Sequence, residues 1–105
     1  MAHIPIEIEN KITRYLNALR INNIPVSKAY LFGSYARGTY NKWSDIDIAL
    51  VSDCFIGDRL EDKKLIRKIT LQVGSDIEPM PFSPGDFNDS DPFAHEILST
   101  GIQLV

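Results

Sequence analysis

The sequence predicts an α+β domain with a small mixed β-sheet and helices packed mainly on one face. Apolar runs within residues 26–32 and 45–51 are typical of strands, and residues 76–81 are expected to form a third strand. Segments 6–22 and 58–73 instead carry apolar residues at helical spacing. A chain of 105 residues is long enough for one hydrophobic core, so we expect a single domain over residues 1–105.

Residues 6–22 form the first predicted helix. Their apolar residues recur at spacings of four, three and four, which places them on one helical face, namely Ile8, Ile12, Tyr15, Leu16 and Leu19. Asn22, Asn23 and Pro25 end the pattern. This face is interpreted as cover for the sheet, with a partner-facing helix as the alternative.

The middle of the chain predicts two strands and a second long helix. Residues 26–32 form the first strand, 34–38 a short helix, 39–44 a loop and 45–51 the second strand. The next helix spans about 58–73, with Asp58 as its N-terminal cap and Gly74 at its exit. Its predicted apolar stripe consists of Leu65, Ile66, Ile69 and Val73.

The C-terminal third predicts a strand, a helix and a final short strand. Residues 76–81 should lie next to the second strand, and Pro79 and Pro81 indicate a short or edge strand. Asp91 and Pro92 are a typical helix start, and Gly101 its stop. The buried face of this helix is expected to be Phe93, Ile97 and Leu98, and residues 102–105 can add an edge strand.

Composition narrows the class of protein. Eleven basic and 14 acidic residues give a net charge of −3, which argues against broad, nonspecific binding of nucleic acid. The single cysteine, Cys54, cannot form an internal disulfide, and no Cys/His cluster has zinc spacing. No run approaches the roughly 18 apolar residues of a membrane span. We therefore expect a cytoplasmic protein.

Two aspartates begin the second predicted strand. Asp45 and Asp47 alternate with Ile46 and Ile48, and residues i and i+2 of a strand share a face. Neighbouring carboxylates repel each other, so the pair is tolerated most easily where a divalent cation neutralises it. Mg²⁺ favours carboxylate, water and phosphate oxygens.

The turn after the first strand supplies a second requirement. Glycine at position 33 allows backbone amides to approach an anion, and a helix starting at Ser34 directs its positive end toward phosphates. A metal pair beside such a turn indicates phosphoryl or nucleotidyl chemistry. No Gly-Lys-Ser/Thr and no G-x-G-x-x-G is present, which excludes P-loop and Rossmann sites.

The spacing of these two features resembles a known signature. Gly33-Ser34, ten residues and then Asp45-Ile-Asp47 is similar to the nucleotidyltransferase superfamily related to DNA polymerase beta. The fuller string GSYARGTYNKWSDIDIAL resembles its smallest branch, the minimal nucleotidyltransferases. Those are prokaryotic proteins often paired, as antitoxin, with a small helical HEPN-domain toxin.

The resemblance implies a metal site. Asp45 and Asp47 would bind two Mg²⁺ ions about 4 Å apart. The family's third carboxylate comes from the next strand, where Glu78 stands, so Glu78 is the expected third ligand and possible base. Asp76, two residues earlier, is a less favoured substitute. Glu followed by proline departs from the family's usual Asp followed by apolar residues.

The resemblance also implies a nucleotide site. Gly33 and Ser34 would contact phosphate, and Arg37 would either bind phosphate or fix the loop through an acid such as Asp45. Nearby aromatic residues are expected to stack on a base or partner, or simply to pack the loop, namely Tyr35, Tyr40 and Trp43. A basic patch on the second long helix is interpreted as a solvated face or a contact for nucleotide or partner, namely Lys63, Lys64, Arg67 and Lys68.

The function implied by the resemblance is Mg²⁺-dependent transfer of a nucleoside monophosphate, AMP from ATP, to a hydroxyl acceptor. The acceptor implied is a tyrosine of a HEPN-type toxin, with this chain as antitoxin. The alternative is a catalytically weak module that neutralises the partner by complex formation. A third hypothesis, addition to an RNA end or a small molecule, is disfavoured by the acidic balance.

Overall fold

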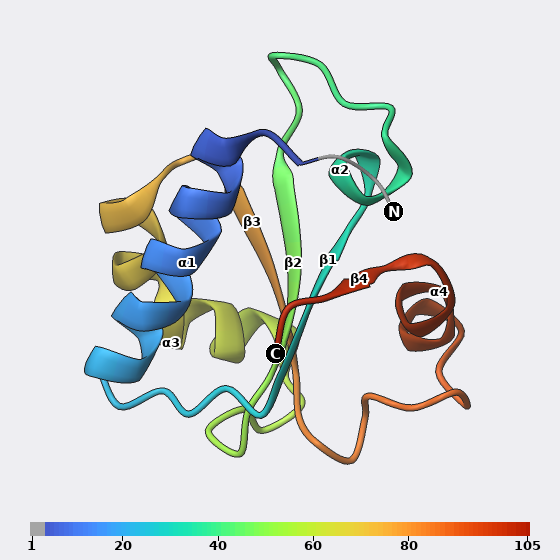
Figure 1. Cartoon of the computed structure of the whole chain (residues 1–105). Coiled ribbons are helices and arrows are strands. Elements are labelled where there is room, and N and C mark those ends of the chain that lie inside the picture. Colours follow the sequence, from blue (N-terminus) through green and yellow to red (C-terminus); the bar gives the residue numbers. More distant parts are fainter. Residues whose placement is uncertain (1–3) are drawn as a thin grey trace.

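One mixed sheet with strand order β3-β2-β1-β4 forms the centre of the computed structural model, which describes residues 4–105 (Figure 1). The strands are β1 (Lys28–Phe32), β2 (Ile46–Val51), β3 (Ile77–Phe82) and β4 (Ile102–Gln103). β1 pairs antiparallel with β2 and β4, whereas β2 and β3 are parallel. The predicted α+β class and mixed sheet are confirmed.

Helices lie on both faces of this sheet, with the two long ones together. α1 (Ile6–Ile21) and α3 (Arg59–Val73) cover one face, and α4 (Pro92–Thr100) covers the other (Figure 1). The short α2 (Ser34–Arg37) follows directly after β1. The expectation of helices mainly on one face thus holds for the long helices.

Alternation along the strands divides the core into two layers. Leu31, Ile46 and Ile48 are fully buried toward α1 and α3. Tyr30 and Ala49 instead face α4, where they pack with its buried residues and with Phe82 and Phe87. Fully burying one large apolar side chain contributes about 1.5–3 kcal/mol. The predicted face of α1 is confirmed, with Ile12, Tyr15, Leu16 and Leu19 buried.

The buried stripe of α3 differs from the prediction at one position. Ile66 and Ile69 are buried as expected, but Leu65 is 50% exposed, so its assignment to the stripe was wrong. Asp62, 2% exposed, completes the stripe instead. Its carboxylate accepts hydrogen bonds from loop backbone amides at 2.9 and 3.0 Å, which is how a charged residue is tolerated there.

The predicted helix caps are present. The Asp58 carboxylate accepts a hydrogen bond from the Glu61 amide at 3.2 Å and begins α3. The Asp91 carboxylate accepts from the Phe93 amide at 3.1 Å and begins α4. Both acids stand at the positive ends of their helices, where a negative charge is stabilising.

Strand β3 is an edge strand, as its prolines predicted. The Ile46 amide donates to the Asp76 carbonyl, so even-numbered residues of β3 turn their backbone polar groups toward β2. Pro79 and Pro81 therefore occupy positions that face away from the sheet, where no amide is needed. The Ile77 amide also faces away and donates to a turn carbonyl. Over 77–81 this edge presents carbonyl acceptors but no unpaired amide donor.

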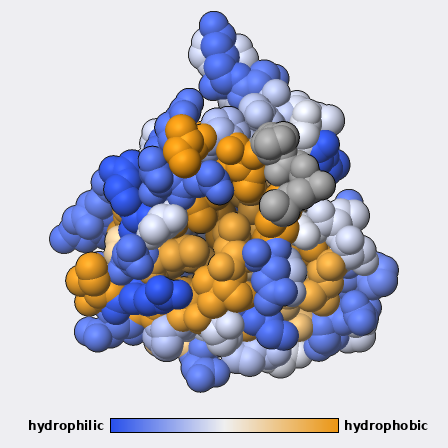
Figure 2. All heavy atoms as spheres, viewed as in Figure 1, coloured by the Kyte–Doolittle hydropathy of each residue, from blue (hydrophilic) through white to orange (hydrophobic). Residues whose placement is uncertain are grey.

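The surface view shows where apolar side chains are left partly exposed. They gather between α1 and α4 on the side of β4 (Figure 2). Partly buried residues that pack against the main core here include Ile102, Leu104 and Val105. Within residues 4–105, no helix is both long enough and apolar enough to cross a membrane.

Candidate active site

Sheet register brings two of the predicted acids side by side. Asp47 on β2 is the direct partner of Glu78 on β3 and of Phe32 on β1. Adjacent strands lie about 4.8 Å apart, so the Asp47 and Glu78 backbones are immediate neighbours on the α4 face. Asp45 immediately precedes β2 and is exposed, whereas Asp47 is half-buried. The predicted aspartate pair therefore lies at the end of β2 nearest the glycine turn.

Gly33 packs directly against the Asp47 carboxylate. Its backbone has φ 75° and ψ −151°, a conformation that side chains rarely adopt. A Cβ placed on Gly33 would lie 2.1 Å from Asp47 Oδ2, far inside any permitted contact. The Gly-Ser turn therefore lies against Asp47, and glycine is required for this approach.

Electrostatics couple the charged residues of the site. Burial raises the pKa of the Asp47 carboxyl above its ordinary value, and repulsion from Asp45 and Glu78 adds to the rise. The Arg37 guanidinium opposes it. Within residues 4–105, no acidic oxygen lies within 4.0 Å of Arg37, so the guanidinium is not tied to Asp45. Phosphate binding is the remaining predicted role of Arg37.

The third predicted carboxylate is paired with a lysine. Lys63 Nζ on α3 donates to Glu78 Oε1 at 3.1 Å. Asp76, the less favoured substitute, is bound by Lys11 Nζ at 3.0 Å. In the part of the chain that the structure describes, no three His, Cys, Asp or Glu side chains are grouped closely enough to hold a metal. The backbone gathers the acids, but the Glu78 carboxylate is turned toward α3.

The donor set nevertheless fits Mg²⁺. Asp47 is half-buried, and burial raises the pKa of its carboxyl, with a further rise from the repulsion of Asp45 and Glu78. A divalent cation held by the Asp45 and Asp47 carboxylates would offset that repulsion, and carboxylate oxygens are ligands that Mg²⁺ prefers. Glu78 on the adjoining strand would supply a third ligand once its side chain left Lys63.

A small hollow beside the turn adds residues that sequence reasoning did not single out. It has a volume of about 180 Å³ and is lined by Gly33 and Arg37 together with Glu96 and Thr100 of α4. Phe93 of α4 packs edge-on against Phe32, with ring centroids 5.6 Å apart. Glu96 lies one helical turn beyond Phe93, and that spacing is the signal that could have placed it here.

The predicted aromatic cluster divides into two. Tyr35 is buried and stacks on Tyr40, with ring centroids 4.6 Å apart and planes 17° apart. Both pack against the core layer on the side of α1, so they serve the loop-packing alternative. Trp43 is 79% exposed, with Lys42 Nζ 4.7 Å above its ring, and only Trp43 remains available for stacking.

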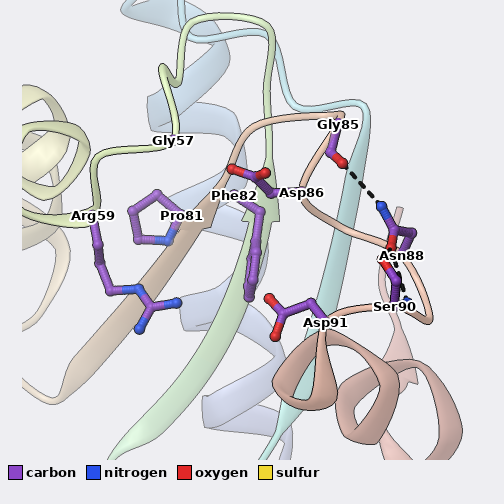
Figure 3. A pocket seen from close by; sticks show the side chains of 9 residues that line it. All are labelled: Gly57, Arg59, Pro81, Phe82, Gly85, Asp86, Asn88, Ser90 and Asp91. Carbon is purple, nitrogen blue, oxygen red and sulfur yellow. Dashed lines mark hydrogen bonds between the residues drawn. The ribbon is translucent and has the colours of Figure 1, made fainter.

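A second, separate hollow lies at the far end of the sheet (Figure 3). It has a volume of about 450 Å³ and lies among Arg59, Phe82, Asp86 and Asp91. The Arg59 guanidinium is 5.8 Å from the Phe82 ring centroid. Phe82 is four residues along β3 from Glu78, or about 13 Å, so this hollow is not part of the acid cluster.

A mixed sheet that sets one aspartate of an Asp-x-Asp pair against a Gly-Ser turn fits the nucleotidyltransferase class of domain. The nucleotidyltransferase domain family matches residues 12–88, which include every predicted site residue. This chain belongs to that family.

Curated relatives agree with this assignment. The protein adenylyltransferase MntA of Shewanella oneidensis is 38% identical over 71 residues, which are 67% of this chain and 48% of that protein. This chain therefore spans about half the length of that relative. A Methanocaldococcus jannaschii protein, whose name gives the same activity provisionally, is 48% identical over 81 residues, 76% of this chain and 78% of the relative.

Solved structures share the fold. A crystal structure of a toxin-antitoxin with AMP-PNP superposes with a TM-score of 0.56 at 31% identity, covering 92% of this chain and 72% of the other. A Sulfolobus solfataricus structure has a TM-score of 0.57, covers 98% of this chain and 89% of the other, and at 18% identity shows the fold alone.

Proposed function

We propose that this chain is a Mg²⁺-dependent nucleotidyltransferase that transfers AMP from ATP to a hydroxyl group of a partner protein. The observation that carries the proposal is the packing of the Asp47 carboxylate against Gly33, with Asp45 and Glu78 close enough to raise its pKa. This packing supports the proposal, because phosphate can approach the backbone of a glycine turn that lies beside the Asp47 carboxylate.

Each residue has a defined role in this reaction. Asp45, Asp47 and Glu78 would hold the metal, which supplies Lewis-acid activation and neutralises phosphate charge. Ser34 is half-buried, and within residues 4–105 its hydroxyl has no hydrogen-bond partner, so it can donate to a phosphate oxygen. Arg37, exposed and close enough to lower the pKa of Asp47, would offset the triphosphate charge.

In the proposed reaction, one bond forms and one bond breaks at the α-phosphorus of ATP. The acceptor oxygen forms a bond to the α-phosphorus of ATP, and the bond from that phosphorus to the bridging oxygen breaks. Pyrophosphate leaves with the electron pair, and the acceptor proton passes to a carboxylate oxygen of Glu78. Holding both reactants in line accounts for most of the catalysis available to a small domain.

We further propose that the acceptor is a tyrosine of a HEPN-type toxin and that this chain acts as its antitoxin. Two findings support this. A 38% identical relative is named a protein adenylyltransferase, and a 31% identical structure is a toxin-antitoxin with AMP-PNP.

A second candidate function is neutralisation of the partner by binding alone. It is favoured by the ion pair at 3.1 Å that keeps the Glu78 carboxylate on Lys63. If Glu78 never leaves Lys63, two aspartates are left to hold the metal and no third carboxylate is left to take the proton.

The test is to incubate the chain with α-labelled ATP, Mg²⁺ and the product of the adjacent gene. Covalent label on that product supports transfer, and a tight unlabelled complex supports the binding module. Asp45→Asn should abolish labelling while the thermal unfolding curve keeps its cooperative shape. Asp53→Asn, an exposed acid just beyond the other end of β2, is the matched control and should leave labelling unchanged. Undiminished labelling by Asp45→Asn would refute the assignment.

A further inference from the structure

The Lys63–Glu78 ion pair joins two side chains that start on opposite faces of the sheet. Glu78 lies on β3, and its register with Asp47 places it on the α4 face. Lys63 lies on α3, which packs on the other face. Because β3 is the edge strand, the Glu78 side chain can reach round the sheet border, where the two charged groups meet at 3.1 Å.

This pair engages the carboxylate of one of the three predicted metal ligands. Asp45 and Glu78 lie near enough to raise the pKa of Asp47, yet no three acids within residues 4–105 are grouped closely enough to bind a metal. A carboxylate oxygen that accepts a hydrogen bond from an ammonium group has that lone pair occupied. A lysine ammonium and Mg²⁺ therefore compete for the same oxygen.

We propose that Lys63 is a positioning residue that holds the third carboxylate out of the metal site until Mg²⁺ displaces it. The inference rests on the proposed function, since it assumes that Asp45, Asp47 and Glu78 are the metal ligands. In this role Lys63 does not contact the substrate. Its ammonium group and Mg²⁺ compete for the Glu78 carboxylate.

The size of the effect follows from exposure. The Lys63 and Glu78 side chains are 35% and 50% exposed, so solvent screens their attraction. Pairs of this kind shift an equilibrium by at most roughly five-fold. Removing the ammonium should therefore tighten Mg²⁺ binding about two- to five-fold, and raising the salt concentration should narrow the difference between variant and wild type.

The chain provides a matched control in the next residue. Lys64 lies on the same helix and pairs with Glu61 at 3.4 Å, not with Glu78. Lys63→Met and Lys64→Met remove the same charge from neighbouring positions. Only Lys63→Met releases Glu78. A gain in Mg²⁺ affinity that comes from the lost positive charge alone would appear in both variants, whereas a gain that comes from the release of Glu78 would appear only in Lys63→Met.

The experiment is calorimetric titration of Mg²⁺ into the whole chain without nucleotide. We expect two- to five-fold tighter binding for Lys63→Met, wild-type affinity for Lys64→Met and for Lys63→Arg, and no gain from Lys63→Met in a Glu78→Gln background. Lys63→Gln replaces Lys63→Met if the methionine variant fails to unfold cooperatively.

The outcomes separate the two proposals. Failure of the wild-type chain to bind Mg²⁺ would overturn the metal site, and the tether with it. Measurable wild-type binding with equal or weaker affinity in Lys63→Met would overturn the tether alone. A gain that persists in the Glu78→Gln background would also overturn it, because that gain does not pass through Glu78.

Discussion

Replacing Gly33 with alanine tests the contact on which the site geometry depends. The added methyl would lie 2.1 Å from Asp47 Oδ2 and 3.0 Å from its Cγ, so the carboxylate has to leave its place against the turn. The backbone at φ 75° and ψ −151° is also in a region almost confined to glycine. The substitution therefore adds backbone strain and displaces a candidate metal ligand.

The magnitude is the sum of these two effects. Strained backbone conformations cost about 1–3 kcal/mol, and displacement of a half-buried carboxylate brings the total to about 2–4 kcal/mol. A loss of that size lowers Tm by roughly 10–25 °C for a domain of this length. Mg²⁺ binding should weaken as well, because Asp47 no longer lies beside the turn.

Urea unfolding of Gly33→Ala and Gly38→Ala provides the measurement and its control. Gly38 has φ 77°, similar to Gly33, but a Cβ there would meet nothing within 4 Å. Gly38→Ala should cost only the left-handed backbone penalty of about 1–2 kcal/mol. Adding Asp47→Ala to Gly33→Ala removes the clashing oxygen and should restore part of the loss. Equal destabilisation by the two glycine substitutions would refute the proposed contact.

Three further predictions concern stability. Asp47→Asn should raise Tm by a few degrees at neutral pH without Mg²⁺, because burial and neighbouring acids raise the pKa of Asp47 and disfavour its charged form in the folded state. The gain should vanish in thermal unfolding curves as the pH falls through that pKa and wild-type Asp47 becomes neutral. Burial raises the pKa of Tyr15 to about 12 in the folded protein. The unfolded chain therefore loses the tyrosine hydroxyl proton at lower pH, and the free energy of unfolding should fall as the pH rises above the ordinary pKa of 10.0. Tyr15→Phe should remove that slope in alkaline denaturation, at a cost of about 1 kcal/mol at neutral pH for the 2.7 Å hydrogen bond to Thr70. Asp62→Ala should cost about 2–4 kcal/mol in urea unfolding because it leaves two loop amides unpaired, and an unchanged midpoint would contradict the capping role.

Features set by neighbouring residues could be predicted from the sequence. Asp58 and Asp91 cap their helices because the cap depends on an amide two or three residues ahead. Pro79 and Pro81 indicated an edge strand because a missing amide is a local property. Leu65 was misplaced because a charged residue was not considered for the buried stripe. Asp62 takes that position, and its carboxylate is satisfied by a loop that no helical pattern describes.

The candidate site divides in the same way. The contact between the glycine turn and Asp47 could be predicted, because the paired backbones of β1 and β2 fix the positions of Gly33 and Asp47. The neighbourhood of Asp47 and Glu78 followed from the expected pairing of β2 with β3. The attachment of Glu78 to Lys63 could not be predicted, because it depends on how α3 is rotated over the sheet border.

The two border prolines also limit how molecules of this chain can meet. A strand arriving from outside adds to a sheet by exchanging amides for carbonyls, and along residues 77–81 only carbonyls are on offer. Two copies brought together there would oppose oxygen to oxygen. Edge-to-edge pairing of two copies of β3 is therefore disfavoured, and a protein that contacts this border can pair with its backbone only by donating hydrogen bonds.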